Sequence, residues 1–167
     1  SETGGGCWLH GPGALETALG TLPLDATNLP LHLSGTDLLQ GQLHHTARRW
    51  LTVENETMLL ELARQRSDVF LLSSGFRGGM PNATVIELLR RAPANTELWH
   101  FGDSDPAGFD ILCDLRKRTG RVIRSLHMNY RPAHPALPLN EKEKLRLHAL
   151  LQSSFLELHE KQTIQSL

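Results

Sequence analysis

The sequence Glu97-Leu98-Trp99-His100-Phe101-Gly102-Asp103-Ser104-Asp105-Pro106 changes character halfway along. Its first half is short and rich in aromatic and aliphatic side chains, which is typical of a β-strand. In its second half, Asp105 is a favourable N-cap, and Pro106 has the fixed φ that the first position of a helix accepts. The segment therefore predicts a strand over residues 97–101 that turns directly into a helix, and Gly120 supplies the stop of that helix.

The same order of strand, turn and helix is repeated on both sides of this segment. Residues 50–53 are β-prone, and Asn55 can cap a helix that runs to about residue 66. Residues 69–72 form a continuous apolar run, as in a strand covered on both faces, and Asn82 can cap a helix through residue 91. Residues 121–126 are a fourth strand candidate. This alternation predicts an α/β fold, a Rossmann-like parallel β-sheet with helices on both faces.

The flanking segments have a different composition. Residues 1–46 are rich in Gly, Pro, Leu and Thr, which predicts an N-terminal extension or linker. Within it, residues 29–33 could form an edge strand and residues 36–43 a short helix. The core is expected over residues 47–131, and residues 132–167 are expected to form C-terminal helices that pack on the core.

The C-terminal helices are predicted from their first residues. Asn140 and Glu143 have the spacing of a capping box, which favours a helix to about residue 151. Ser153 or Ser154 could cap a final helix that contains Phe155.

Composition limits the class of protein. A chain of 167 residues with 40% apolar and 21% charged residues is an ordinary globular domain, which excludes disordered and fibrous classes. No run of about 18 apolar residues predicts a membrane span, and no secretory signal is expected. The two cysteines, Cys7 and Cys113, form no CxxC motif, so a reducing cytoplasm is expected. The net charge of −1 does not by itself indicate a nucleic-acid binder, although basic residues gather over residues 116–124.

Three acidic residues follow two of the predicted strands. Glu54 follows the strand at residues 50–53, and Asp103 and Asp105 follow the strand at residues 97–101. Ligands of parallel sheets bind outside the carboxyl ends of the strands, where these side chains would converge. Because three converging carboxylates repel one another unless a cation joins them, the pattern predicts a Mg²⁺ or Mn²⁺ site. Such a site favours phosphoryl chemistry, with Glu54 binding the ion or handling a proton; a surface cap is the alternative for Asp-x-Asp alone.

Several other residues are accessory candidates. Arg77, in a glycine-rich loop, could contact a phosphate. Asp110 is expected to face solvent on the helix after the motif, close enough to support the site. Glu160, with Glu157, could supply a further acidic ligand if the last helix folds over the strand ends, and otherwise belongs to a solvated helix face. His100 is expected to have a core or sheet role rather than to bind zinc.

Two segments of the sequence resemble the signature segments of a Toprim domain, and a third resembles the strand that follows them in one group of these domains. They are Thr52-Val53-Glu54-Asn55, His100-Phe101-Gly102-Asp103-Ser104-Asp105-Pro106-Ala107-Gly108-Phe109-Asp110-Ile111-Leu112, and Ser125-Leu126-His127-Met128. The family that they resemble is the C-terminal domain of JetD, the nuclease subunit of Wadjet plasmid-defence systems, and more distantly the Toprim domain of the topoisomerase VI A subunit. The resemblance covers residues 49–131.

The resemblance implies a Toprim fold and Mg²⁺ (or Mn²⁺) binding by Glu54, Asp103 and Asp105. It also implies DNA endonuclease activity within a complex of condensin-like SMC subunits, and a homodimer is compatible with it. Two alternatives stay open: a catalytically silent Toprim-like module that binds DNA or partner subunits, and a small-molecule phosphohydrolase or transferase that uses the Asp-x-Asp site.

Overall fold

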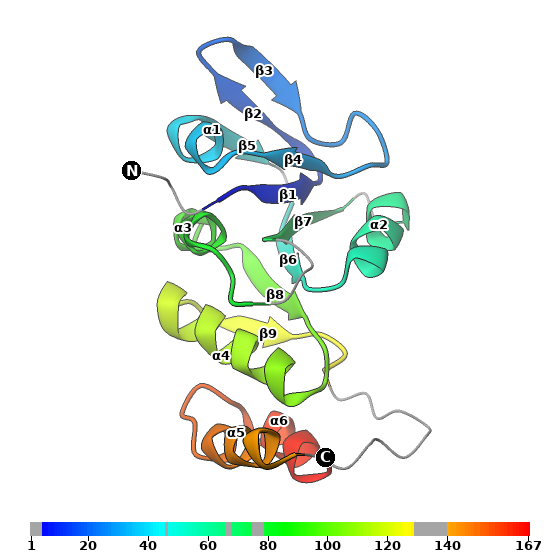
Figure 1. Cartoon of the computed structure of the whole chain (residues 1–167). Coiled ribbons are helices and arrows are strands. Elements are labelled where there is room, and N and C mark those ends of the chain that lie inside the picture. The colour runs from blue at the N-terminus through cyan, green and yellow to red at the C-terminus, as the bar shows by residue number, and fades with distance from the viewer. Residues whose placement is uncertain (1–4, 46, 66–67, 75–78, 129–139) are drawn as a thin grey trace.

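The computed structural model describes residues 5–45, 47–65, 68–74, 79–128 and 140–167. It is a mixed α/β structure with a six-stranded, mostly parallel sheet and a separate three-stranded sheet near the N-terminus (Figure 1). The α/β fold class expected from the sequence, consistent with a Rossmann-like or Toprim-like fold, is confirmed. Across the described residues, no helix combines the length and hydrophobicity needed to cross a bilayer.

The elements alternate along the chain as the sequence pattern predicts from residue 49 onward. In order they are β1 (Cys7–His10), β2 (Gly13–Thr17), β3 (Gly20–Pro23), β4 (Leu31–Leu33), α1 (Gly35–Gln40), β5 (Gln42–His45), β6 (Arg49–Val53), α2 (Glu56–Gln65), β7 (Val69–Ser73), α3 (Ala83–Arg91), β8 (Glu97–Phe101), α4 (Pro106–Thr119), β9 (Ile123–Ser125), α5 (Glu141–Leu151) and α6 (Leu158–Gln165).

The main sheet has the strand order β4-β1-β7-β6-β8-β9. Its β7-β6-β8-β9 part is parallel, which fits the strand–helix–strand pattern of the sequence. The other two strands are antiparallel, because β1 pairs with both β4 and β7 in that orientation. The sheet is therefore mixed, and the expectation of a wholly parallel sheet holds only for its four strands from β6 to β9.

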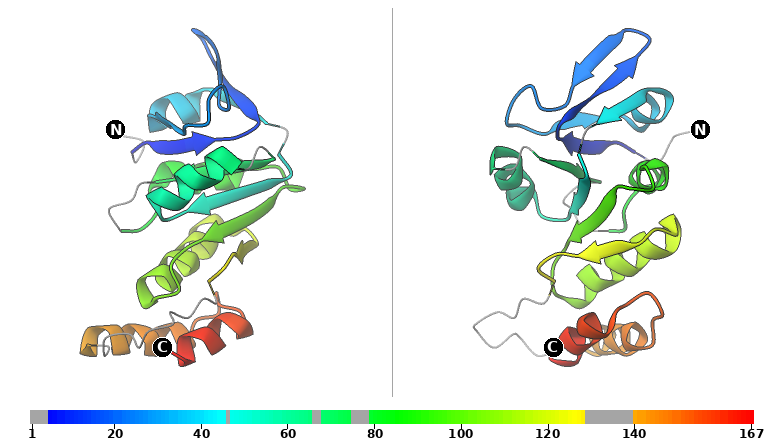
Figure 2. Two further views of the ribbon diagram at one scale, coloured as in Figure 1. Left: turned by 90° about the vertical axis from the view of Figure 1, so that its right-hand side faces the viewer. Right: turned by 180° about the vertical axis from the view of Figure 1, so that it is seen from behind.

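Helices lie on both faces of this sheet, as predicted. Helix α2 packs on β6 and β7 on one side, while α3 and α4 cover the other side (Figure 2). The alternation of side chains in β6 explains the two layers. Trp50 belongs to the core under α3 and α4, and Leu51 and Val53 belong to the core under α2. Helices α5 and α6 extend this second layer, with α5 packed against α4.

The predicted caps of α3, α4 and α5 are confirmed. Asn82 accepts a hydrogen bond from the Val85 N–H, and Asn140 forms the capping box with Glu143. Asp105 caps α4, and Gly120 ends it in the left-handed conformation with a φ of 64°. These local signals were readable from the sequence because each cap satisfies the helix that immediately follows or precedes it.

The N-terminal segment differs from the predicted linker. Its described residues supply β1 to β5 and α1, and β1 lies inside the main sheet rather than at its edge. The short strand expected at residues 29–33 is β4, which does occupy an edge. The last helix also differs: it begins after Glu157, so neither Ser153 nor Ser154 caps it, and Phe155 precedes it.

Candidate metal centre

Glu54 and Asp103 meet at the carboxyl ends of two neighbouring parallel strands. The register pairs Val53 with Phe101, and the Glu54 N–H continues the pairing by donating to the Phe101 carbonyl at 3.1 Å. Just beyond the end of β8, the backbone N–H of Asp103 donates to Glu54 Oε2 at 3.1 Å. The strand ends therefore bring together two acidic residues that are 49 positions apart in the chain.

Asp105 completes the acidic group from the start of α4. Its Oδ1 accepts a hydrogen bond from the Gly108 N–H at 2.7 Å, which holds the carboxylate at the helix N-terminus. Asp103 and Asp105 are exposed, while Glu54 is half-buried. The three side chains thus stand at one edge of the sheet, around the turn from β8 into α4.

The charges of the three carboxylates act on one another. Burial raises the pKa of Glu54, and the charges of Asp103 and Asp105 raise it further. The hydrogen bond from the Asp103 N–H lowers this pKa but does not cancel the increase. The pKa of Asp103 is raised by burial and then by the charge of Asp105. The charge of Asp105 therefore makes ionisation of Glu54 and Asp103 less favourable, and the charge of Asp103 does the same for Glu54; a bound cation reverses this effect.

Two glycines allow this close arrangement. A Cβ on Gly102 would lie 2.9 Å from Glu54 Oε2 and 2.6 Å from His100 Nε2. A Cβ on Gly108 would lie 2.0 Å from the Asp103 carbonyl oxygen, so any larger residue would push the acidic turn off the first turn of α4. The glycine three residues after Asp105 is thus a packing requirement of the Asp-x-Asp turn.

The donor chemistry fits a hard divalent cation. Carboxylate oxygens are preferred ligands of Mg²⁺, and two of these three side chains face solvent, where water and phosphate oxygens can complete the coordination. The ligand atoms of Glu54, Asp103 and Asp105 do not all lie within 4.8 Å of one another. Among the described residues, only the ligand atoms of Glu157, His159 and Glu160 lie within 4.8 Å of one another. An ion bound by Glu54, Asp103 and Asp105 together would therefore require their side chains to rotate.

The accessory candidates have separate outcomes. Asp110 is half-buried on α4, where it forms an ion pair with Arg146 of α5 at 2.8 Å. The sequence predicted a solvent-facing side chain here, so the structure differs from that prediction. Burial raises the pKa of Asp110, and the charge of Arg146 reduces that increase without cancelling it. Arg77 lies outside the described residues.

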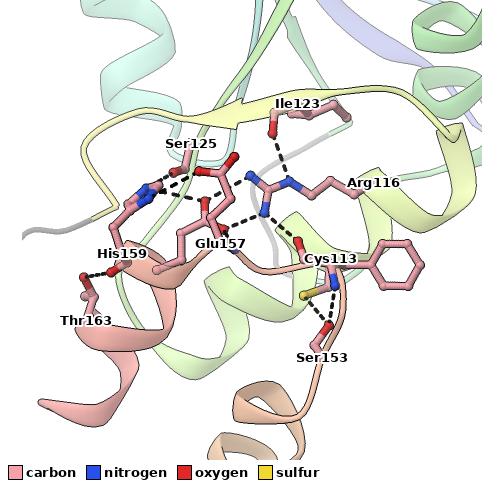
Figure 3. Close-up of polar contacts among 10 residues, drawn as sticks. Cys113, Arg116, Ile123, Ser125, Ser153, Glu157, His159 and Thr163 are labelled. Atoms are coloured by element: carbon pink, nitrogen blue, oxygen red, sulfur yellow. Dashed lines mark hydrogen bonds and ion pairs between the residues drawn. The ribbon is translucent and has the colours of Figure 1, made fainter.

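Glu160 is neither a solvated surface residue nor positioned at the acidic edge. Its side chain is 1% exposed, and both its oxygens accept hydrogen bonds from Arg116 of α4. Figure 3 shows the Arg116 side chain, which also donates to the Ile123 carbonyl, on the side of α4 where Glu157 and His159 lie. His159 approaches the Glu160 carboxylate at 3.9 Å. Because the guanidinium already neutralises Glu160, the close group formed with Glu157 and His159 is a structural ion pair network that anchors α6.

His100 is the residue of this region that sequence reasoning did not single out as functional. Its side chain is 2% exposed, and its Nδ1 is 2.7 Å from the Thr52 hydroxyl oxygen, as expected for a core role. Its Nε2, however, has no hydrogen-bond partner among the described residues. Burial, then the nearby Arg116 charge, lowers the pKa of His100 to about 4, so the ring is neutral at pH 7. Its place just before the acidic turn was the only signal in the sequence.

A pocket lies beside His100 and Glu54, between the sheet and the helices α3 and α4. Its lining includes five polar residues at the carboxyl ends of β6, β7 and β8, namely Thr52, Glu54, Ser73, Ser74 and His100. The acidic edge therefore continues inward into a small pocket, whose other walls include the apolar side chains of Val85, Ile111 and Leu115.

The fold and this edge define an α/β domain with a carboxylate cluster at the carboxyl ends of parallel strands. The family model described as Wadjet protein JetD, C-terminal, matches residues 21–167, and the chain belongs to that family. A comparison with curated proteins finds no match.

Proposed function

We propose that this chain is a Mg²⁺-dependent, Toprim-type DNA endonuclease domain that works in the cytoplasm as the nuclease part of a Wadjet-like plasmid-defence complex. The observation that carries the proposal is the hydrogen bond from the Asp103 N–H to Glu54 Oε2, which joins the two acidic strand ends. Membership of the JetD C-terminal family supports the connection with Wadjet defence.

Each acidic residue has a role that follows from its position. Asp103 and Asp105, which face solvent, would hold Mg²⁺ or Mn²⁺ from the turn, while Glu54 would complete the ligand set or take the proton of an attacking water. A bound divalent ion supplies Lewis-acid stabilisation of the negative charge that develops on a phosphodiester during hydrolysis. The raised pKa of Glu54 supports the proton-handling role, because a base titrating nearer neutrality transfers protons more effectively.

The proposal includes partners. DNA is the substrate, and condensin-like SMC subunits recruit the domain to it, in keeping with the Wadjet family assignment. The net charge of −1 gives the chain little general attraction for DNA. The proposal therefore requires that other subunits bring the domain to its substrate. A homodimer is compatible with the proposal.

The test is cleavage of supercoiled plasmid by the chain, alone and with its complex subunits, in Mg²⁺ or Mn²⁺. Glu54→Gln, Asp103→Asn and Asp105→Asn are each expected to reduce the cleavage rate at least a hundredfold. Glu56→Gln is the matched control, because it removes an exposed carboxylate two residues from Glu54 and is expected to cleave like the unaltered chain.

The alternatives give different results in the same assay. A chain that shifts the mobility of DNA but never cuts it with its partner subunits present is a binding module. A chain that releases phosphate from small phosphate esters without nicking plasmid is a phosphohydrolase. Either result overturns the nuclease proposal.

A further inference from the structure

The side chain of His100 presents an unsatisfied nitrogen to the pocket beside Glu54. Its Nε2 is buried and has no hydrogen-bond partner in the described part of the chain, although buried polar atoms are nearly always paired. The same nitrogen is 2.6 Å, and Glu54 Oε2 is 2.9 Å, from the point where a Cβ on Gly102 would lie. Both atoms therefore lie close to the Gly102 backbone, and His100 and Glu54 also line the same pocket.

The hydrogen bonds on the other side of the ring determine which nitrogen carries the proton. The Thr52 hydroxyl is 3.3 Å from the Trp99 carbonyl, to which it can only donate, since a carbonyl oxygen is an acceptor. Having used its single proton there, the hydroxyl oxygen accepts from His100 Nδ1 at 2.7 Å. In the neutral ring Nδ1 then carries the proton, and Nε2 presents a lone pair to the pocket.

Two acceptors are thus brought to one pocket, the Nε2 lone pair and the carboxylate of Glu54. They cannot bond directly while the carboxylate is ionised, and a donor with two protons is needed between them. The pocket has a volume of about 40 Å³, and its mixed lining includes the polar side chains of Thr52, Ser73 and Ser74 besides His100 and Glu54. One water needs roughly 10–15 Å³ and two to four polar partners. Water satisfies both the chemistry and the size.

We infer that His100 is a positioning residue for Glu54, which it holds through a water in this pocket that donates one hydrogen bond to Nε2 and one to the Glu54 carboxylate. The inference rests on the proposed function, since it assigns Glu54 a task at the metal centre. With the Asp103 N–H fixing Oε2, the water supplies a second anchor, so the glutamate is held in one orientation. Partners of this indirect kind typically change metal affinity roughly 10–100-fold when they are removed.

Two substitutions separate this role from the structural role of the ring. In His100→Asn the side-chain amide occupies the position of Nδ1, so it keeps the bond to Thr52 and loses the atom that faces the pocket. In His100→Gln the amide reaches the position of Nε2, so it keeps the pocket-facing acceptor and loses the bond to Thr52. The Mn²⁺ dissociation constant, measured by calorimetry on the whole chain, is expected to rise at least tenfold in His100→Asn and to change less than threefold in His100→Gln.

The melting temperature without metal provides the structural readout, and it is expected to fall more in His100→Gln than in His100→Asn. Equal Mn²⁺ affinities in the two variants, or weaker binding in the glutamine variant, would overturn the inference. Histidine ¹⁵N spectra of the unaltered chain give an independent check: a proton on Nε2 at pH 7, in place of the expected Nδ1 proton, would also overturn it.

Failure of this inference is distinguishable from failure of the proposed function. If the unaltered chain binds Mn²⁺ and Glu54→Gln weakens that binding, but His100→Asn does not, only the role of His100 is lost. If Glu54→Gln leaves Mn²⁺ binding unchanged, the metal centre itself is wrong.

Discussion

Arg116 on α4 and Glu160 on α6 form a buried, bidentate ion pair. Arg116 Nη1 donates to Glu160 Oε1 at 2.6 Å and Nη2 donates to Oε2 at 3.0 Å, and the two side chains are 9% and 1% exposed. The same guanidinium donates to the carbonyls of Ile123 and Phe155. Burial alone would raise the pKa of Glu160, but the bonds from Arg116 and from the Glu157 N–H outweigh it and lower that pKa. One side chain thus joins α4, β9 and the start of α6.

Removing the charge of Glu160 should therefore destabilise the fold strongly. Glu160→Gln leaves the guanidinium buried without its counter-charge, and we expect a loss of about 3 kcal/mol in the free energy of unfolding, measured with urea. Asp114→Asn is the control, because its pair with Arg118 on the same helix is partly exposed and should contribute less than about 1 kcal/mol. Losses of similar size in the two variants would show that the buried pair has no special weight.

His100 should make stability depend on pH in a defined window. Its pKa is about 4 in the folded chain, below the 6.5 of an unperturbed histidine, so the unfolded chain binds more protons between these values. The contribution is fully present above pH 6.5 and is lost as the pH falls toward 4. We expect the unaltered chain to lose about 3 kcal/mol relative to His100→Gln over this window, from urea unfolding at several pH values. Parallel pH profiles of the two proteins would contradict the lowered pKa.

The two aspartates of the acidic turn should differ in their effect on metal-free stability. Asp105→Ala removes the N-cap of α4 and should cost about 1 kcal/mol. Asp105→Asn keeps an acceptor for the Gly108 N–H while it removes the charge, so it should be at least as stable as the unaltered chain. Thermal unfolding in a chelator measures both, and equal losses in the alanine and asparagine variants would remove the capping argument.

A divalent cation should stabilise the fold through the acidic edge. At about 100 times its dissociation constant, Mn²⁺ should add roughly 2.7 kcal/mol to the free energy of unfolding. Glu54→Gln should remove most of this gain and yet raise the stability of the metal-free chain, since it relieves repulsion from Asp103 and Asp105. Glu56→Gln should behave like the unaltered chain. If Mn²⁺ leaves the melting temperature of all three proteins unchanged, the metal centre is contradicted.

The glycine of the acidic turn should tolerate no side chain. Gly108→Ala places a Cβ 2.0 Å from the Asp103 carbonyl oxygen, so the turn must move away from α4. We expect a loss of about 2 kcal/mol in stability together with weaker Mn²⁺ binding. Ala107→Ser, at the exposed neighbouring position, is the control and should change both quantities little. Unchanged Mn²⁺ affinity in Gly108→Ala would show that the turn does not shape the site.

Local signals account for what the sequence could predict. Asp105, Pro106 and Gly120 mark the ends of α4 through contacts with the helix itself, and the apolar run of β7 reflects burial on both of its faces. Glu54 and Asp103 could be placed together because parallel strands end at the same edge of a sheet.

Non-local pairing accounts for what it could not predict. The insertion of β1 between β4 and β7 depends on backbone hydrogen bonds that leave no mark on the side-chain pattern of residues 7–10. The burial of Glu160 depends on a partner 44 positions earlier in the chain, so the periodicity of the last helix alone indicated a solvated face. The orientation of His100 required the geometry of two strands and a helix.

The position of β1 has a practical consequence for dissecting the protein. The family model begins at residue 21, and the regular strand–helix pattern begins at residue 49, but β1 ends before either point. A fragment cut at either boundary would leave the backbone groups of β7 without their neighbour along one side. Such an open margin recruits strands from other molecules, so these fragments should precipitate or self-associate even though every acidic residue of the edge is still present.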